Sequence, residues 1–382
     1  MRIESVTIHR VALPLVRPFR TSFGIEYDKD VLLLEVTSDV GVGWGECVAA
    51  PDPLYSHEFN DAALLVLRDH LVPRVMGRDI TAEDVPRLLA PVRGHPMARG
   101  ALELAILDAQ LRASGRSFAS YLGADRSAIP CGVSVGIPAD DSLETLVAEV
   151  DGYVAEGYRR IKLKIEPGWD IEPTRVIRER YPELPLQVDA NQAYSRADIE
   201  HLLALDTFDL LLIEQPIHEE DYLGHKLLAE RMTTPMCLDE SILSVDNADS
   251  LIDYGACEVI NIKAGRVGGY LAARDIHDLA VSRGIPVWCG GMVETGIGRA
   301  ANVALAALPG FTLPGDTSSS TRFFATDITE PLLMDADGMM AVPSGPGLGV
   351  TPIPELLDQF ATGRHEMDAH GSAILPNLAR TA

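Results

Sequence analysis

The sequence lacks several features that identify particular classes of protein. It has no apolar run of about 18 residues, so no transmembrane helix is predicted. Its first residues, MRIESVTIHR, contain no apolar stretch behind a basic one, which argues against a signal peptide. The five cysteines are far apart and form no C-x-x-C pair. They favour reduced thiols in a cytoplasm over a disulfide framework or a zinc finger.

Basic residues are also scarce, with 32 Lys and Arg against 56 Asp and Glu and a net charge of -24. This balance argues against nucleic acid or an anionic membrane as a partner, because basic groups supply the non-specific part of such binding. Hydrophobic residues make up 47% and charged residues 23%, close to the average of soluble globular proteins. The 382 residues are enough for about two domains.

The N-terminal part predicts an α+β domain over residues 1–125, because strand patterns are followed by helical ones. Alternating apolar residues predict antiparallel strands, and apolar residues at helical spacing predict the helices. Two intervening segments rich in turn residues, Arg17–Gly24 and Ala49–Ser56, are predicted as loops, the first with exposed aromatic side chains. The predicted strands are Ile3–Leu15, Val31–Val36 and Trp44–Val48, and the predicted helices are Asn60–Val75 and Ala98–Ala113.

Residues 126–320 have a different pattern, in which short apolar runs alternate with amphipathic helices. Polar residues end five of these runs at intervals of 25, 25, 25 and 24 residues: Lys164, Asp189, Glu214, Asp239 and Lys263. A βα unit of nearly constant length, with a functional group at the end of each strand, predicts an α/β fold of the TIM (β/α)-barrel type.

Two further segments extend this prediction. Ile129–Ile137 is expected to be the first strand of the barrel, and Gly310–Pro314 a short eighth one. The C-terminal segment, residues 321–382, is too long for one barrel helix and is expected to return to the N-terminal domain and complete it.

Three of the strand-end residues are carboxylates, Asp189, Glu214 and Asp239. Like charges at one barrel mouth need a cation, and an all-oxygen ligand set suits Mg²⁺, with Mn²⁺ as a substitute. Three protein ligands leave coordination sites open for a substrate carboxylate. Helix N-capping is an alternative role for one or two of these acids, but it explains three at matching intervals poorly.

Two lysines, Lys164 and Lys263, lie one strand before and one strand after the carboxylates. On a ring of strands they would face each other, which suits proton transfer on both faces of one carbon. The base must be neutral, and the like charge of Lys162, on the same strand face, would lower the pKa of Lys164. Arg266 could act similarly on Lys263. A solvated Lys-x-Lys strand is the alternative, and it fits poorly in a strand covered on both sides.

These residues together carry a resemblance to a known family. The chain resembles the muconate lactonizing enzyme subgroup of the enolase superfamily. Within it, the chain is similar over nearly its full length to the N-succinylamino acid racemase / o-succinylbenzoate synthase family. The motifs that carry the resemblance are Lys162-x-Lys164, Asp189-Ala190-Asn191, Glu214-Gln215-Pro216, Asp239-Glu240-Ser241 and Lys263.

The resemblance implies Asp189, Glu214 and Asp239 as metal ligands, and Lys164 and Lys263 as the acid/base pair acting on a small-molecule carboxylate. It implies an N-terminal capping domain whose two loops close over the substrate, and a homo-oligomer, often an octamer. Among relatives, an arginine at the position of Arg266 accompanies racemase activity.

The candidate substrate contacts come from the capping loops and from the barrel mouth. Ser134 lies in a G-x-S-x-G match that lacks the context of a hydrolase, and small-residue packing is an equally good reading of it. Backbone groups of Gly291, Met292 and Val293 could bind an N-acyl group, with a structural turn as the alternative. The remaining candidates are Phe19, Phe23, Tyr55, Asn191, Asp316 and Phe323.

Racemisation and o-succinylbenzoate synthesis use the same residues, so the sequence leaves both open, and Arg266 favours a racemase that retains synthase activity. A synthase alone, or another subgroup member such as a dipeptide epimerase or cycloisomerase, also remains open. A non-catalytic metal-binding or solute-binding barrel would not need two lysines and is disfavoured.

Overall fold

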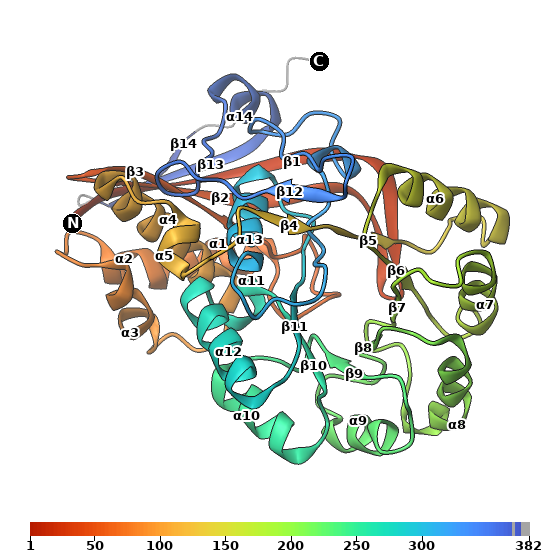
Figure 1. The fold of residues 1–382 in the computed structure, drawn as a ribbon. Coiled ribbons are helices and arrows are strands. Elements are labelled where there is room, and N and C mark those ends of the chain that lie inside the picture. The colour runs from red at the N-terminus through yellow and green to blue at the C-terminus, as the bar shows by residue number, and fades with distance from the viewer. Residues whose placement is uncertain (369–370, 376–382) are drawn as a thin grey trace.

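The computed structural model of the chain describes residues 1–368 and 371–375, so part of the predicted C-terminal segment, 369–370 and 376–382, lies outside the described residues. Two sheets dominate the fold, a five-stranded antiparallel sheet and a seven-stranded parallel one (Figure 1). None of the helices in the described residues combines the length and apolar character needed to cross a membrane.

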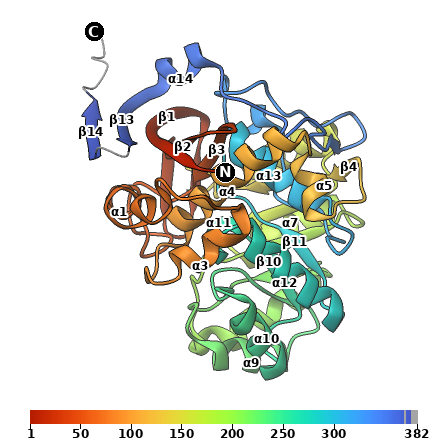
Figure 2. The ribbon, with the colours of Figure 1, turned by 90° about the vertical axis from the view of Figure 1, so that its left-hand side faces the viewer.

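The antiparallel sheet has the order β14-β13-β1-β2-β3 and joins the two ends of the chain. β13 pairs with β1, and β14 lies outside it at the edge of the sheet (Figure 2). The prediction that the C-terminal tail completes the N-terminal domain is therefore confirmed. The strands are β1 (Ile3–Thr21), β2 (Gly24–Ser38), β3 (Gly41–Cys47), β13 (Ala361–Asp368) and β14 (Gly371–Leu375).

The predicted loop at Arg17–Gly24 is wrong in its extent. After an irregularity between Pro14 and Phe19, pairing of β1 with β2 resumes and continues to Thr21 opposite Gly24. The segment is therefore the end of a long hairpin, and Phe19 and Phe23 are half-buried rather than exposed. The hairpin descends to the barrel (Figure 1), where the hydroxyl of Ser22 donates a hydrogen bond to the carbonyl of Ala190, 3.0 Å away.

The helices of this domain are organised around α4, which packs on β3. The packing is close: a Cβ added at Gly45 would lie 2.1 Å from the carbonyl oxygen of Ala101, and one at Gly43 would lie 2.2 Å from that of Ala105. The glycines therefore let the helix approach the strand. The helices are α1 (Asn60–Val66), α2 (Val72–Val75), α3 (Val85–Leu89), α4 (Pro96–Ser114) and α5 (Phe118–Leu122).

The parallel sheet has the order β11-β10-β9-β8-β7-β6-β5 and forms the barrel wall. Its ring is closed by the predicted eighth strand, Gly310–Pro314, together with the residue that follows it. Phe311 makes a bridge to Val287, and Gly315 makes one to Cys131. The barrel prediction is confirmed. The strands are β5 (Gly132–Val135), β6 (Arg160–Lys164), β7 (Leu186–Asp189), β8 (Ile213–Glu214), β9 (Met236–Leu238), β10 (Val259–Ile262) and β11 (Val287–Cys289).

Helices alternate with these strands and surround the barrel, except for the short α11 (Ala264–Val267), which packs against α4 of the N-terminal domain (Figure 1). They are α6 (Leu143–Glu156), α7 (Ile171–Arg180), α8 (Ile199–Leu202), α9 (Tyr222–Ala229), α10 (Val245–Tyr254), α11 (Ala264–Val267), α12 (Tyr270–Arg283) and α13 (Gly296–Ala306). A small ribbon of β4 (Ala128–Pro130) and β12 (Met339–Ala341), followed by α14 (Pro354–Phe360), leads the chain back to the antiparallel sheet. The first part of the predicted first strand thus belongs to this ribbon.

Candidate active site

The strand register brings the regularly spaced polar residues together at one end of the barrel. Lys164 on β6 pairs with Asp189 on β7, and Asp189 pairs with Glu214 on β8. Asp239 and Lys263 directly follow β9 and β10. All five side chains are buried, with the three carboxylate residues at most 1% exposed. The constant spacing of the βα units is what places these groups side by side.

Lys162 and Lys164 both face the carboxylates of the neighbouring strands. Lys164 Nζ lies 2.6 Å from Asp189 Oδ2 and 2.5 Å from Asn191 Oδ1. Lys162 Nζ lies 3.2 Å from both Asp189 Oδ2 and Glu214 Oε2. The alternation of β6 thus directs its charged residues into the barrel, and the solvated-strand alternative is excluded.

Lys263 approaches from the other side of the carboxylates. Its Nζ lies 2.7 Å from Asp239 Oδ2 and 3.1 Å from the phenol oxygen of Tyr55, in the predicted loop Ala49–Ser56. Arg266 on α11 is buried and pairs with the other oxygen of Asp239. Its remaining donors bind the carbonyls of Asn261 at 2.7 Å and Ile242 at 2.9 Å. Arg266 therefore acts on the surroundings of Lys263 through their shared carboxylate.

Burial and charge shift the pKa values of the two lysines in opposite directions. Burial lowers the pKa of Lys164, and the like charge of Lys162 adds to it, which outweighs the attraction of Asp189. Burial also disfavours the charged form of Lys263, but the surrounding acidic groups together outweigh it and raise the pKa; in order of effect they are Tyr55, Glu240, Glu214 and Asp189. The expected influence of Lys162 on Lys164 is therefore present. The two lysines differ because their neighbours carry different net charge.

The three carboxylates of the site are the candidate ligands of a divalent cation. Among the described residues, no group of three or more His, Cys, Asp or Glu side chains is arranged to hold a metal ion as it stands. Ammonium and guanidinium groups lie between the carboxylates instead. The donors nevertheless fit a hard cation, because Asp189, Glu214 and Asp239 are buried carboxylates on neighbouring strands that need positive charge beside them. Oε2 of Glu240, next to Asp239, also finds no hydrogen-bond partner in the part of the chain that is described.

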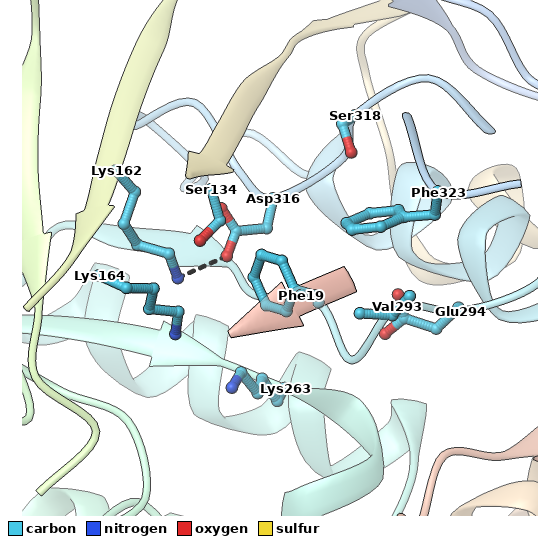
Figure 3. Close-up of a pocket in the computed structure, with 11 residues that line it drawn as sticks. Phe19, Ser134, Lys162, Lys164, Lys263, Val293, Glu294, Asp316, Ser318 and Phe323 are labelled. Carbon is cyan, nitrogen blue, oxygen red and sulfur yellow. Dashed lines mark hydrogen bonds and ion pairs between the residues drawn. The ribbon is translucent and has the colours of Figure 1, made fainter. Parts of the chain in front are cut away.

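One cavity joins the lysines to several predicted substrate contacts. Figure 3 shows Lys162, Lys164 and Lys263 pointing toward one space, with Phe19 between the lysines and Phe323. The two aromatic rings meet edge to face with centroids 6.1 Å apart. The predicted contacts that line this cavity are Phe19, Ser134, Gly291, Val293, Asp316 and Phe323.

Two of these residues have unusual local surroundings. The hydroxyl of Ser134 is buried and has no hydrogen-bond partner among the described residues. Val293 has φ 58°, which is strained for a β-branched residue and is typical of functional loops. Both features favour contact with a ligand over simple packing.

The other predicted contacts lie around neighbouring cavities. Phe23, Tyr55 and Asn191 line a second cavity beside the barrel mouth, with Glu240. Met292 lines a third, beneath the capping sheet, and its backbone N–H donates to Glu294 at 2.7 Å. Asn191 reaches the active site through its hydrogen bond with Lys164.

Sequence reasoning missed three residues of the site, Arg160, Glu294 and Ser318. Glu294 and Ser318 line the main cavity. Arg160 is fully buried and binds Asp316 Oδ1 at 2.9 Å with both terminal nitrogens. The alternation Arg160-x-Lys162-x-Lys164 could have revealed Arg160, because all three side chains must share one strand face.

The chain is similar to known proteins over nearly its whole length. Residues 3–123 match the mandelate racemase / muconate lactonizing enzyme N-terminal domain family, and residues 145–356 match the enolase C-terminal domain-like family. An N-succinylamino acid racemase of Amycolatopsis sp is 58% identical over 366 residues, 95% of this chain and 99% of the relative. An o-succinylbenzoate synthase of Bacillus subtilis (strain 168) is 42% identical over 374 residues, 97% of this chain and 100% of the relative. The crystal structure of an enolase superfamily member from Listeria innocua Clip11262, 39% identical, superimposes with a TM-score of 0.92 and covers 96% of this chain and 99% of that one.

Proposed function

We propose a function from one premise: the chain belongs to the mandelate racemase / muconate lactonizing enzyme family of the enolase superfamily. Within it, the chain is a divalent-metal-dependent racemase of N-acylamino acids, with N-succinylamino acids as the substrate class. The observation that carries this proposal is that Lys164 on β6 and Lys263 after β10 line one cavity from opposite sides of three buried carboxylates. The 58% identity to an N-succinylamino acid racemase supports the choice of substrate.

Asp189, Glu214 and Asp239 would hold the cation, for which we propose Mg²⁺, with Mn²⁺ able to replace it. When bound, the cation supplies positive charge that stabilises the negative charge developing on the substrate carboxylate. Two further elements belong to this proposal. The homo-oligomer rests on the resemblance alone, and light scattering on the purified protein would test it. The cytoplasmic location rests on the five cysteines, which form no C-x-x-C pair and favour reduced thiols.

The lysines carry the proton transfer. One lysine, as the neutral amine, removes the proton from the carbon next to the substrate carboxylate, and the electron pair delocalises to give an enediolate. The other lysine, as the ammonium, returns a proton to the opposite face of that carbon. The reverse sequence converts the other enantiomer, and exchange with solvent restores both lysines to their starting charges. Lys162 remains protonated beside its carboxylates and supplies fixed positive charge.

A second activity, o-succinylbenzoate synthesis, is favoured by the 42% identity to a synthase. In that reaction one lysine removes a proton and then protonates the departing hydroxyl on the same face, so that water leaves. The other lysine stays protonated and stabilises the enediolate. The same residues thus serve both reactions.

Proton exchange in D₂O tests the proposal. The purified protein is incubated with N-succinyl-L-phenylalanine, with Mg²⁺ or with a chelator, while the α-proton is followed by NMR together with optical rotation. Metal-dependent exchange with loss of rotation is the expected result. Exchange with full retention would mean that one lysine alone is a competent base, which favours the synthase. No exchange would contradict the proposed substrate class.

A further inference from the structure

Tyr55 is the point at which the capping domain touches one of the two lysines. Its side chain is buried, 7% exposed, although it belongs to the loop that follows β3. Its phenol oxygen lies 3.1 Å from Lys263 Nζ, and its ring centroid lies 4.8 Å from the same nitrogen. The ring also packs against Phe23 of the β1–β2 hairpin, with centroids 5.8 Å apart. Two separate segments of the cap thus meet over Lys263.

Lys164 has no comparable contact with a cap side chain among the described residues. The hydrogen-bond partners of its ammonium group, Asp189 and Asn191, both belong to the barrel. The hairpin reaches this side through the hydroxyl of Ser22, which binds the backbone carbonyl of Ala190, and through Arg20, which binds Glu166 at 2.8 Å. Neither side chain is a hydrogen-bond partner of the Lys164 ammonium group. The two lysines are therefore held differently, Lys164 by the barrel alone and Lys263 by the barrel and the cap together.

We propose that Tyr55 is a positioning residue for Lys263, which makes proton transfer on the Lys263 face of the substrate depend on closure of the cap. This inference rests on the proposed two-lysine racemase. Tyr55 does not contact the reacting carbon in this role. It fixes the direction in which Lys263 presents its proton or its lone pair.

Both the phenol oxygen and the aromatic ring of Tyr55 restrict the orientation of the Lys263 side chain. An ammonium group has three N–H donors. On Lys263, one donor is taken by Asp239 Oδ2 at 2.7 Å and another by the phenol oxygen. The third is left to face the cavity that Lys263 lines. The aromatic face, a favourable neighbour for a cation, restricts the remaining rotation of the side chain. Without Tyr55 the amine would sample directions that do not point at the substrate carbon.

Exchange measured separately on each face tests this role. Each enantiomer of N-succinylphenylalanine is incubated in D₂O with Mg²⁺ and the wild-type, Tyr55→Phe or Tyr55→Leu protein. NMR gives the rate of α-proton exchange, and chiral chromatography gives the fraction inverted. The Lys263→Arg variant keeps the positive charge but provides no effective base at this position. The enantiomer whose exchange it slows is therefore the one that Lys263 deprotonates.

We expect Tyr55→Phe to slow exchange of that enantiomer about tenfold, and Tyr55→Leu to slow it further. Exchange of the other enantiomer should stay within about twofold of wild type, with a larger share of its product retaining configuration. A general loss of folding would slow both enantiomers alike, so the imbalance between the two faces reports on positioning.

Tyr254→Phe is the matched control, because Lys226 lies over the ring of Tyr254 at 4.7 Å on the outside of the barrel. This variant should exchange both enantiomers at the wild-type rate. Equal slowing of both faces in the two Tyr55 variants, or no slowing in either, would overturn the positioning role while leaving the racemase proposal intact. Absence of exchange in the wild-type protein would overturn both.

Discussion

Lys162 Nζ lies 2.6 Å from Asp316 Oδ2, so the first lysine of the Lys-x-Lys motif is paired with a carboxylate from the segment that closes the barrel (Figure 3). Arg160 binds the other oxygen of Asp316 at 2.9 Å. Burial disfavours the charged form of Asp316, but the two cations outweigh it and hold its pKa well below the usual range. Asp316 was predicted as a substrate contact. Its carboxylate lines the cavity, and both of its oxygens are engaged by cations.

Replacing Asp316 with asparagine is expected to destabilise the fold by about 3 kcal/mol, because Lys162 and Arg160 would lose a charged partner inside the barrel. Urea denaturation followed by circular dichroism measures the change. Glu172→Gln, which breaks a surface pair with Arg175 on α7, is the control and should leave the denaturation midpoint unchanged. A loss below about 1 kcal/mol in Asp316→Asn would show that the buried cations find other partners.

Replacing either Lys164 or Lys263 with arginine should reduce racemisation about a thousandfold, because arginine keeps the charge but does not give up its proton. Loss of optical rotation measures the rate, and circular dichroism verifies the fold. Lys226→Arg on the outer face of α9 is the control and should racemise normally. Full racemase activity in Lys164→Arg would contradict the two-lysine mechanism.

Removal of divalent cations should abolish exchange and lower the thermal midpoint. Ligand binding to the native state stabilises it, so the midpoint should rise again with added Mg²⁺ or Mn²⁺. Glu214→Gln should weaken this response, because the amide replaces one buried carboxylate of the donor set. Differential scanning calorimetry with and without metal checks both points.

Glu230→Gln on the outer surface, which touches none of the three carboxylates, should respond to metal like the wild-type protein. An unchanged midpoint at all metal concentrations would mean that these carboxylates are neutralised by lysine and arginine alone.

The barrel could be predicted from the sequence because the polar residues at the ends of its strands recur at a nearly constant interval. Each βα unit has nearly the same length, so Lys164, Asp189 and Glu214 recur at a fixed interval that survives small errors in strand boundaries. Lys162 and Lys164 could be placed together for a second reason, because residues two apart on a strand share one face. Local patterns of this kind need no knowledge of the rest of the fold.

The contacts between the cap and the barrel could not be predicted in this way. Tyr55 and Lys263 are separated by 208 positions, and Lys162 and Asp316 by 154. No local pattern relates residues so far apart. At the hairpin end around Phe19 the local sequence predicts a loop, because Pro18 and Gly24 are turn residues. Pairing with β2 overrode that local preference, since the ladder resumes at Phe19 after the irregularity that follows Pro14.

Glu46 on β3 provides the last prediction, because it links the cap to the barrel from a buried position. Its carboxylate accepts hydrogen bonds from the backbone N–H groups of Thr295 at 3.0 Å and Gly298 at 2.8 Å, at the N-terminus of α13. Burial, only partly offset by these hydrogen bonds, raises the pKa of Glu46 to about 7. The folded state therefore holds this proton more tightly than the unfolded chain does.

The sign of the pH dependence follows from linkage. The contribution of Glu46 to stability is fully present below the pKa of the unfolded chain and is lost as the pH rises through about 7. Glu46→Gln removes this titration but keeps an acceptor for the helix. The free energy of unfolding of the wild type should therefore fall relative to Glu46→Gln by up to about 3 kcal/mol between roughly pH 5 and pH 8.

Urea denaturation across that range measures the difference. Asp28→Asn, an exposed position on β2, is the control and should run parallel to the wild type. A constant gap between the wild type and Glu46→Gln would mean that the N-terminus of α13 stabilises the carboxylate enough to cancel the effect of burial.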